Sequence, residues 1–173
     1  MTVLFYLMVG YALLGSVDIG YFHLFRCRLY RSASSRLEQG THFVREILFL
    51  AAFFWVMFVK AQGVYALILP VLLLVDFVNS LVDVLLEPKS RVSLGGLPPG
   101  EYFIHMLTMF LNGAVMAVAF LESAKAMHEE PQLIFRTLEV PFPALVVGGQ
   151  ILVGTAVLFL VELILRIRFR RAE

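Results

Sequence analysis

The sequence predicts an all-α integral membrane protein with five transmembrane helices, of which the first four form a bundle of two parallel pseudo-repeats. Of the 173 residues, 60% are hydrophobic and 16% are charged, and the mean hydropathy is +0.86. A soluble domain carries about a quarter charged residues, because water has to wet its surface. The composition therefore argues against a soluble enzyme, a nucleic-acid-binding protein and a disordered chain.

Five apolar stretches are long enough for transmembrane helices, since about 20 helical residues cross a bilayer core about 30 Å thick. Within a single transmembrane domain over residues 1–173, they cover residues 3–23, 43–59, 64–86, 102–121 and 142–167. The second helix is expected to begin in water, where Ser35-Arg36-Leu37-Glu38 has the form of a capping box. It is expected to end near Lys60.

Short polar segments between the stretches predict the connections. A tight turn at residues 61–63 makes the second and third helices an antiparallel hairpin, and the prolines in the turn at residues 95–100 suit the first turn of the fourth helix. Residues 24–42 and 87–101 form loops on one side of the membrane. Residues 122–141 form a longer loop on the other side, with room for a short surface helix.

Basic residues indicate the orientation, because Lys and Arg are retained on the cytoplasmic side. The C-terminal tail contributes Arg166, Arg168, Arg170 and Arg171, and the segment between the third and fourth spans contributes Lys89 and Arg91. The segment between the first and second spans holds Arg26, Arg28, Arg31, Arg36 and Arg45. The other side has only Lys60, Lys125 and Arg136. We therefore expect a cell inner-membrane protein with the N-terminus outside and the C-terminus in the cytoplasm. The first span lacks the features of a cleaved signal peptide, so we expect it to be retained.

Polar side chains recur at helical spacing in and beside the apolar stretches. Because a charge at the bilayer centre costs about 2.5–3.5 kcal/mol on insertion scales, we expect these side chains to face the protein interior. The third span has a polar face made of Asp76, Asn79, Ser80, Asp83 and Glu87. Similar faces in the second and fourth helices are made of Glu38, His42 and Arg45, and of Glu101, His105, Thr108 and Asn112.

The same order of residues occurs twice. In each half, a helix ends in an aspartate, a cytoplasmic loop follows, and the next helix opens with Glu-x-x-x-His. The residues are Asp18, Glu38 and His42 in the first half, and Asp83, Glu101 and His105 in the second. Because both halves run in the same direction, a pseudo-twofold axis along the membrane normal would bring these six side chains together near the cytoplasmic face.

Four carboxylates and two imidazoles are the ligand types of a carboxylate-bridged di-metal centre in a helical bundle. Such mixed oxygen and nitrogen ligands suit iron, manganese or zinc. The sequence therefore predicts a divalent or di-iron metal centre, with Glu87 and His23 as candidate additional ligands, although His23 falls on a different face from Asp18. The single cysteine, Cys27, excludes an intrachain disulfide and a cysteine-based metal site within one chain.

Other interpretations of these residues stay open. The glutamates could cap helices or sit at helix N-termini, where the dipole favours an anion. The aspartates could pair with Arg26, Arg28 or Arg91 in a structural ion network. Haem is a further alternative, because His42 and His105 open their helices on the same side and could ligate one iron axially.

The leading functional prediction is a membrane-embedded, metal-dependent oxidoreductase, with a di-iron centre acting on a lipid or other apolar substrate near the cytoplasmic face. One alternative is a non-catalytic accessory subunit of a larger membrane complex. Another is a proton- or ion-translocating protein, for which Asp76 is the best argument because it lies deeper than the other carboxylates. The expected partners are membrane lipid and other membrane subunits or a second copy of the chain, and no nucleic acid.

Overall fold

The computed structural model describes residues 2–135 and 140–170. Residues 136–139 of the expected external loop, with Arg136 and Glu139, and Arg171 of the basic tail lie outside the described residues. Within them, five helices are long and apolar enough to cross a membrane, as the sequence predicts. These helices are Val3–Arg26, Ala33–Phe58, Gly63–Ser90, Pro99–Ala126 and Phe142–Phe169.

Each crossing helix contains one main α-helix, and three of them are extended by turns of a different pitch. The α-helices are α1 (Thr2–Val17), α2 (Arg36–Phe58), α3 (Ile68–Ser90), α4 (Pro99–Ala126) and α5 (Phe142–Arg170). The π-helix η1 (Asp18–Arg26) continues α1. The short 3-10 helices are η2 (Leu29–Arg31), η3 (Ala33–Ser35), η4 (Gly63–Leu67) and η5 (Val92–Leu94).

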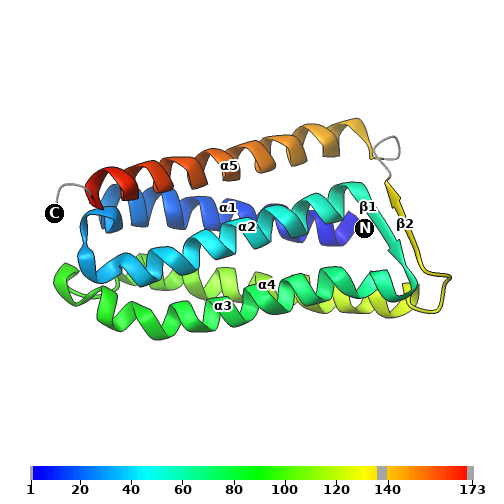
Figure 1. The fold of residues 1–173 in the computed structure, drawn as a ribbon, viewed down its shortest axis with the longest axis horizontal. Coiled ribbons are helices and arrows are strands. Elements are labelled where there is room, and N and C mark those ends of the chain that lie inside the picture. Colours follow the sequence, from blue (N-terminus) through cyan, green and yellow to red (C-terminus); the bar gives the residue numbers. More distant parts are fainter. Residues whose placement is uncertain (1, 136–139, 171–173) are drawn as a thin grey trace.

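The five helices run side by side along the long axis of the molecule (Figure 1). Helix α2 packs against α3 and α1 packs against α4, while α5 lies over α1 and α2. Met8, Phe53 and Met57 form the centre of an apolar core, with at most 1% of each residue exposed. Buried polar side chains gather toward the end where η1 and the α3–α4 connection lie. The bundle is therefore apolar toward one end and polar toward the other.

The connection between α2 and α3 differs from the predicted tight turn. Strand β1 (Val59–Gln62) continues directly from α2 and pairs antiparallel with β2 (Gln132–Phe135), which lies in the expected external loop. This pairing gives hydrogen-bond partners to backbone that a simple turn would leave to water. In the described part of that loop, a strand therefore takes the place of the expected surface helix.

The predicted capping box at Ser35 and Glu38 is wrong. Ser35 precedes α2, but its side chain makes no capping hydrogen bond and instead donates to the carbonyl oxygen of Ser90 at 3.4 Å. Glu38 accepts a hydrogen bond from the Ser90 hydroxyl and pairs with Arg91. The charged partner across the bundle competes successfully with the local cap. By contrast, Pro99 occupies the first turn of α4, as predicted.

Candidate metal centre

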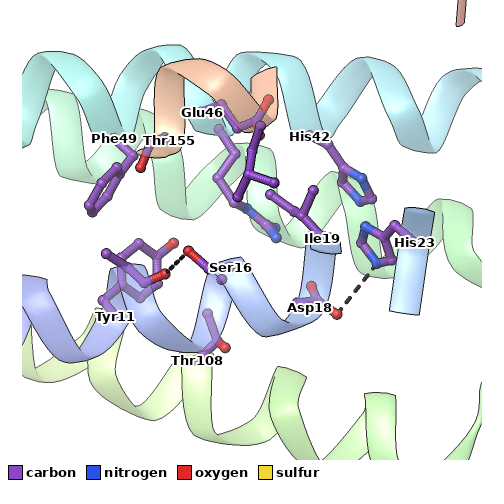
Figure 2. A pocket seen from close by; sticks show the side chains of 14 residues that line it. Tyr11, Ser16, Asp18, Ile19, His23, His42, Glu46, Phe49, Thr108 and Thr155 are labelled. Atoms are coloured by element: carbon purple, nitrogen blue, oxygen red, sulfur yellow. Dashed lines mark hydrogen bonds and ion pairs between the residues drawn. The ribbon is translucent and has the colours of Figure 1, made fainter. Parts of the chain in front are cut away.

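The change from α to π geometry at Asp18 positions the first ligands. In η1 the backbone N–H of Cys27 donates to the carbonyl of Phe22, five residues earlier, at 2.8 Å. Asp18 and His23 are also five residues apart, so the wider helix places them on one face, with His23 Nε2 3.4 Å from Asp18 Oδ1 (Figure 2). The prediction that His23 lies on a different face from Asp18 is wrong, because it holds only for α-helical spacing.

The first ligand group consists of Asp18, His23, Glu101 and His105. Each offers one ligand atom, and these four atoms lie within 4.8 Å of one another. His23 Nε2 is 3.1 Å from Glu101 Oε1, and His105 Nε2 is 3.1 Å from Asp18 Oδ1. Glu101 and His105 are one turn apart on α4, so both reach η1 from the same helical face.

The second ligand group consists of His23, Glu38 and His42, all three buried, and their ligand atoms again lie within 4.8 Å of one another. The rings of His23 and His42 stack, with centroids 4.3 Å apart and planes inclined by 9°. Figure 2 shows the two rings facing each other from η1 and α2, with Asp18 beside them. Because His23 belongs to both groups, the two groups adjoin.

Arg91 lies between the two glutamates of these groups. Its Nη2 is 2.7 Å from Glu38 Oε1 and also donates to Glu101 Oε1. Although burial opposes the charge, the carboxylates of Glu38 and Glu101 raise the pKa of Arg91. Only 1% of Arg91 is exposed, and its Nε and Nη1 have no hydrogen-bond partner among the described residues.

Cys27 lies beside the same glutamate and was not among the predicted site residues. Its thiol donates to Glu101 Oε2 at 3.7 Å. Partial burial and the negative charge of Glu101 raise the pKa of the Cys27 thiol. A higher pKa leaves less thiolate at neutral pH, so the thiol is a donor to Glu101 rather than a nucleophile.

Two of the predicted ligands, Asp83 and Glu87, belong to neither group. Asp83 Oδ1 is 3.4 Å from His42 Nε2, and its other oxygen is 3.2 Å from Arg45 Nη2. Glu87 Oε1 is 2.9 Å from His105 Nδ1. Both carboxylates therefore contact a histidine of a ligand group, and a carboxylate in this position fixes the orientation of an imidazole that binds a metal.

Sequence reasoning missed two buried glutamates near His42. Glu162 of α5 is 1% exposed, and its Oε1 is 3.9 Å from His42 Nδ1. Glu46 of α2 is 3% exposed, and neither of its carboxylate oxygens has a hydrogen-bond partner in the described part of the chain. A charge in an apolar span is costly, and Glu162 lies in such a span just as Asp18 does. The same argument that singled out Asp18 could therefore have identified Glu162 from the sequence.

Asp76 forms a separate polar cluster deeper in the bundle. Its Oδ2 accepts hydrogen bonds from the Tyr11 hydroxyl and from Asn112 Nδ2, both at 3.2 Å. The cluster ties α1, α3 and α4 together, and it shares no residue with the two ligand groups. The ion-path interpretation based on Asp76 stays a prediction.

The donor set fits a bound cation. Among the described residues, the buried Nδ1 of His23 has neither a hydrogen bond nor an ion-pair contact, whereas its Nε2 faces Asp18 and Glu101. Buried polar atoms are nearly always partnered, so His23 Nδ1 points to a missing partner. Imidazole nitrogens and carboxylate oxygens can both donate an electron pair to a metal ion, so a cation is one partner that suits this set of side chains.

The fold and the ligand groups define the class: a helical protein of the membrane-spanning type, with buried His, Asp and Glu side chains at distances compatible with a metal centre. Comparisons with protein-family models, with curated proteins and with solved structures found no match.

Proposed function

We propose that this protein is a membrane-embedded, metal-dependent oxidoreductase, with a di-iron centre that acts on a lipid or other apolar substrate. The observation that carries the proposal is the position of His23 in both ligand groups. Two adjoining groups of carboxylates and imidazoles provide two neighbouring metal positions rather than one. Iron accepts this mixture of oxygen and nitrogen ligands.

The contacts between the two halves of the chain support the proposed pseudo-repeat. Asp18 of the first half contacts His105 of the second, at 3.1 Å. Asp83 of the second half contacts His42 of the first, at 3.4 Å. The paired glutamates of the two halves, Glu38 and Glu101, both contact Arg91. A twofold arrangement accounts for this reciprocal pattern.

The polar residues of the proposed centre have two roles, metal binding and orientation of the metal ligands. We assign metal binding to the six side chains that make up the two groups: Asp18, His23, Glu38, His42, Glu101 and His105. Asp83 and Glu87 contact the rings of His42 and His105 and would hold them in orientation. When bound, iron supplies redox chemistry with oxygen, and the protein supplies a site from which bulk water is kept out.

The proposal includes an orientation and partners. The basic loops on the ligand side would lie in the cytoplasm of a cell with an inner membrane, with the N-terminus outside and the C-terminus inside. The exposed apolar side chains would contact membrane lipid, other membrane subunits or a second copy of the chain.

Metal analysis of the purified protein, together with an absorption spectrum, tests the function. Glu101→Gln should lose metal while the protein still inserts and purifies, because Gln keeps the shape but not the charge that a cation needs. Asp76→Asn is the matched control, since Asp76 is also a buried carboxylate of the bundle but lies in neither group. Full metal content in Glu101→Gln would remove Glu101 from the site, and a Soret band would favour haem.

The accessory-subunit alternative is favoured by the ion pairs. Arg91 pairs with Glu38 and Glu101, and Arg45 pairs with Asp83, so several carboxylates already have a cationic partner. If these pairs only hold helices together, the wild-type protein contains no metal at any loading. A Glu101→Gln variant would then differ from the wild type in stability alone.

A further inference from the structure

A cavity between α1, α2 and α5 adjoins the ligand groups. It contains about 560 Å³ of space not filled by atoms, part of it open to the outside. Its walls include Ala12, Phe49 and Leu158, and Asp18, His23 and His42 also line it. Figure 2 shows Phe49, Asp18, His23 and His42 among the side chains around the cavity.

Helix α5 forms one wall of the cavity and contacts the bundle near both of its ends. Toward the start of α5, a Cβ added at Gly148 would lie 2.5 Å from Met57 Sδ, so α5 and α2 approach closely there. Toward the end of α5, Arg166 Nη2 donates to the Arg36 carbonyl at 3.1 Å. Thr155 and Leu158 lie between these contacts and are partly exposed. Because these two residues both line the cavity and are partly exposed, this wall would face lipid in a bilayer.

Two ionisable side chains in the cavity wall have unused hydrogen-bonding atoms. Glu46 is 3% exposed and has two carboxyl oxygens without a partner among the described residues. Arg45 has a buried Nε–H without a partner there, while its Nη2 is occupied by Asp83. The wall thus offers one unused acceptor and one unused donor beside the ligand groups. Leaving such groups unpaired costs free energy.

We propose that this cavity binds a bilayer-soluble alcohol or phenol, whose hydroxyl donates to Glu46 and accepts from Arg45 Nε. A hydroxyl is both donor and acceptor, so it satisfies both side chains. A hydrocarbon satisfies neither of them. A carboxylate has no proton to donate to Glu46, and an ammonium group has no lone pair to accept from Arg45, so each of them satisfies only one of the two side chains. The inference rests on the proposed function in treating this molecule as the substrate.

Photolabelling in lipid nanodiscs tests the binding without any activity. The probe is a long-chain alcohol with a diazirine in its chain, applied to the full-length protein with and without metal, and labelled peptides are identified by mass spectrometry. We expect label on α1 and α5 around the cavity. The unlabelled alcohol should compete at least about tenfold better than the alkane, amine or fatty acid of the same chain length.

Variants with matched controls locate the site. Glu46→Leu should weaken competition by the alcohol about tenfold. Glu46→Gln keeps the shape of the side chain and a hydrogen-bonding group, so it should weaken competition less, and it provides a second variant in case Glu46→Leu misfolds. Ile47→Leu, on the exposed side of the same helix, should have no effect. Gly15→Leu should fill the cavity, because Gly15 lines it and a Cβ there meets nothing within 4 Å. Gly154→Leu has the same open surroundings outside the cavity lining and is the control.

Several results would overturn the inference. They are equal competition by alkane and alcohol, stronger competition by the amine or the fatty acid, normal binding in Glu46→Leu, and label away from the cavity. Because the metal-free protein is labelled as well, the two proposals fail separately. If the purified protein binds the alcohol but contains no metal, the proposed alcohol site is supported and the proposed oxidoreductase function is contradicted. If it contains metal but does not bind the alcohol, the proposed alcohol site is contradicted and the proposed metal centre is supported.

Discussion

The imidazole rings of His23 and His42 lie face to face, with centroids 4.3 Å apart, although they come from different helices. A stack of this kind is held by contacts on both rings, so a change in one ring disturbs the other. It also brings the two ligand groups into contact through one residue. The position of His23 therefore gives the sharpest test of whether the two groups act as one centre.

His23→Ala should lose metal from both groups, because His23 is a member of each. His42→Ala removes a ligand from the second group alone and should retain part of the metal. Metal content of the purified variants, measured by elemental analysis, separates the two. Equal and partial losses in both variants would mean that the groups are independent.

Arg91→Gln should destabilise the metal-free protein by about 3–5 kcal/mol, the usual cost of removing one partner from a buried ion pair. Glu38 and Glu101 would be left without their cation. If a metal binds the same glutamates, adding iron should raise the unfolding temperature of this variant more than that of the wild type. Thermal unfolding in detergent measures both effects, and no rescue by metal would favour a structural role.

Alkylation of Cys27 should require a higher pH than that of an ordinary thiol, because burial and the Glu101 charge raise its pKa. Only the thiolate reacts, so the rate rises as pH approaches the pKa of the thiol. In Glu101→Gln the charge is absent, the pKa falls, and the rate profile should move to lower pH. Iodoacetamide labelling across pH measures this, and an unchanged profile would contradict the contact.

The orientation can be tested by labelling in intact cells. In a Cys27→Ser background, a cysteine at Ser93 should be shielded from an impermeant thiol reagent, whereas one at Glu130 should react. The two positions lie in connections at opposite ends of the bundle, and the side chains of both residues are exposed. Reversed labelling would place the ligand groups on the outer side of the membrane.

Gly63→Ala should lower the stability of the protein by about 1–3 kcal/mol at the β1–β2 ribbon, because Gly63 has φ of +59° and an added Cβ would lie 2.7 Å from Pro131 Cα. Gly95→Ala is the control, since Gly95 also has positive φ but has open space around its Cβ position. Gly95→Ala should lower the stability less than Gly63→Ala does, and the thermal unfolding temperatures of the two variants provide the comparison. An equal cost would mean that backbone strain alone matters.

Much of this arrangement could be predicted from the sequence, because two strong physical signals apply. The lengths of the apolar stretches predicted the five crossing helices. The free-energy cost of a charge in a membrane predicted that Asp18, Asp83 and neighbouring polar side chains face the protein interior. The π-helix at Asp18 has no comparable signal, so the place of His23 was missed. The pairing of Arg91 with Glu38 and Glu101 depends on how separate helices meet, which helical spacing within one segment does not encode.

The ribbon of β1 and β2 ties the α2–α3 connection to the chain that follows α4, at the end of the bundle opposite to η1 and the α3–α4 connection. Three features hold the helices in position at this end: the β1–β2 ribbon, the close approach of Gly63 to Pro131, and the apolar core. The opposite end, with the ligand groups, is held by the α1–α2 and α3–α4 connections and by the buried pairs of Arg91 with Glu38 and Glu101. A cation bound by these glutamates would compete with Arg91 for them, so the spacing of the carboxylates and imidazoles depends on charge, whereas the spacing of the helices at the ribbon end depends on backbone hydrogen bonds and apolar packing.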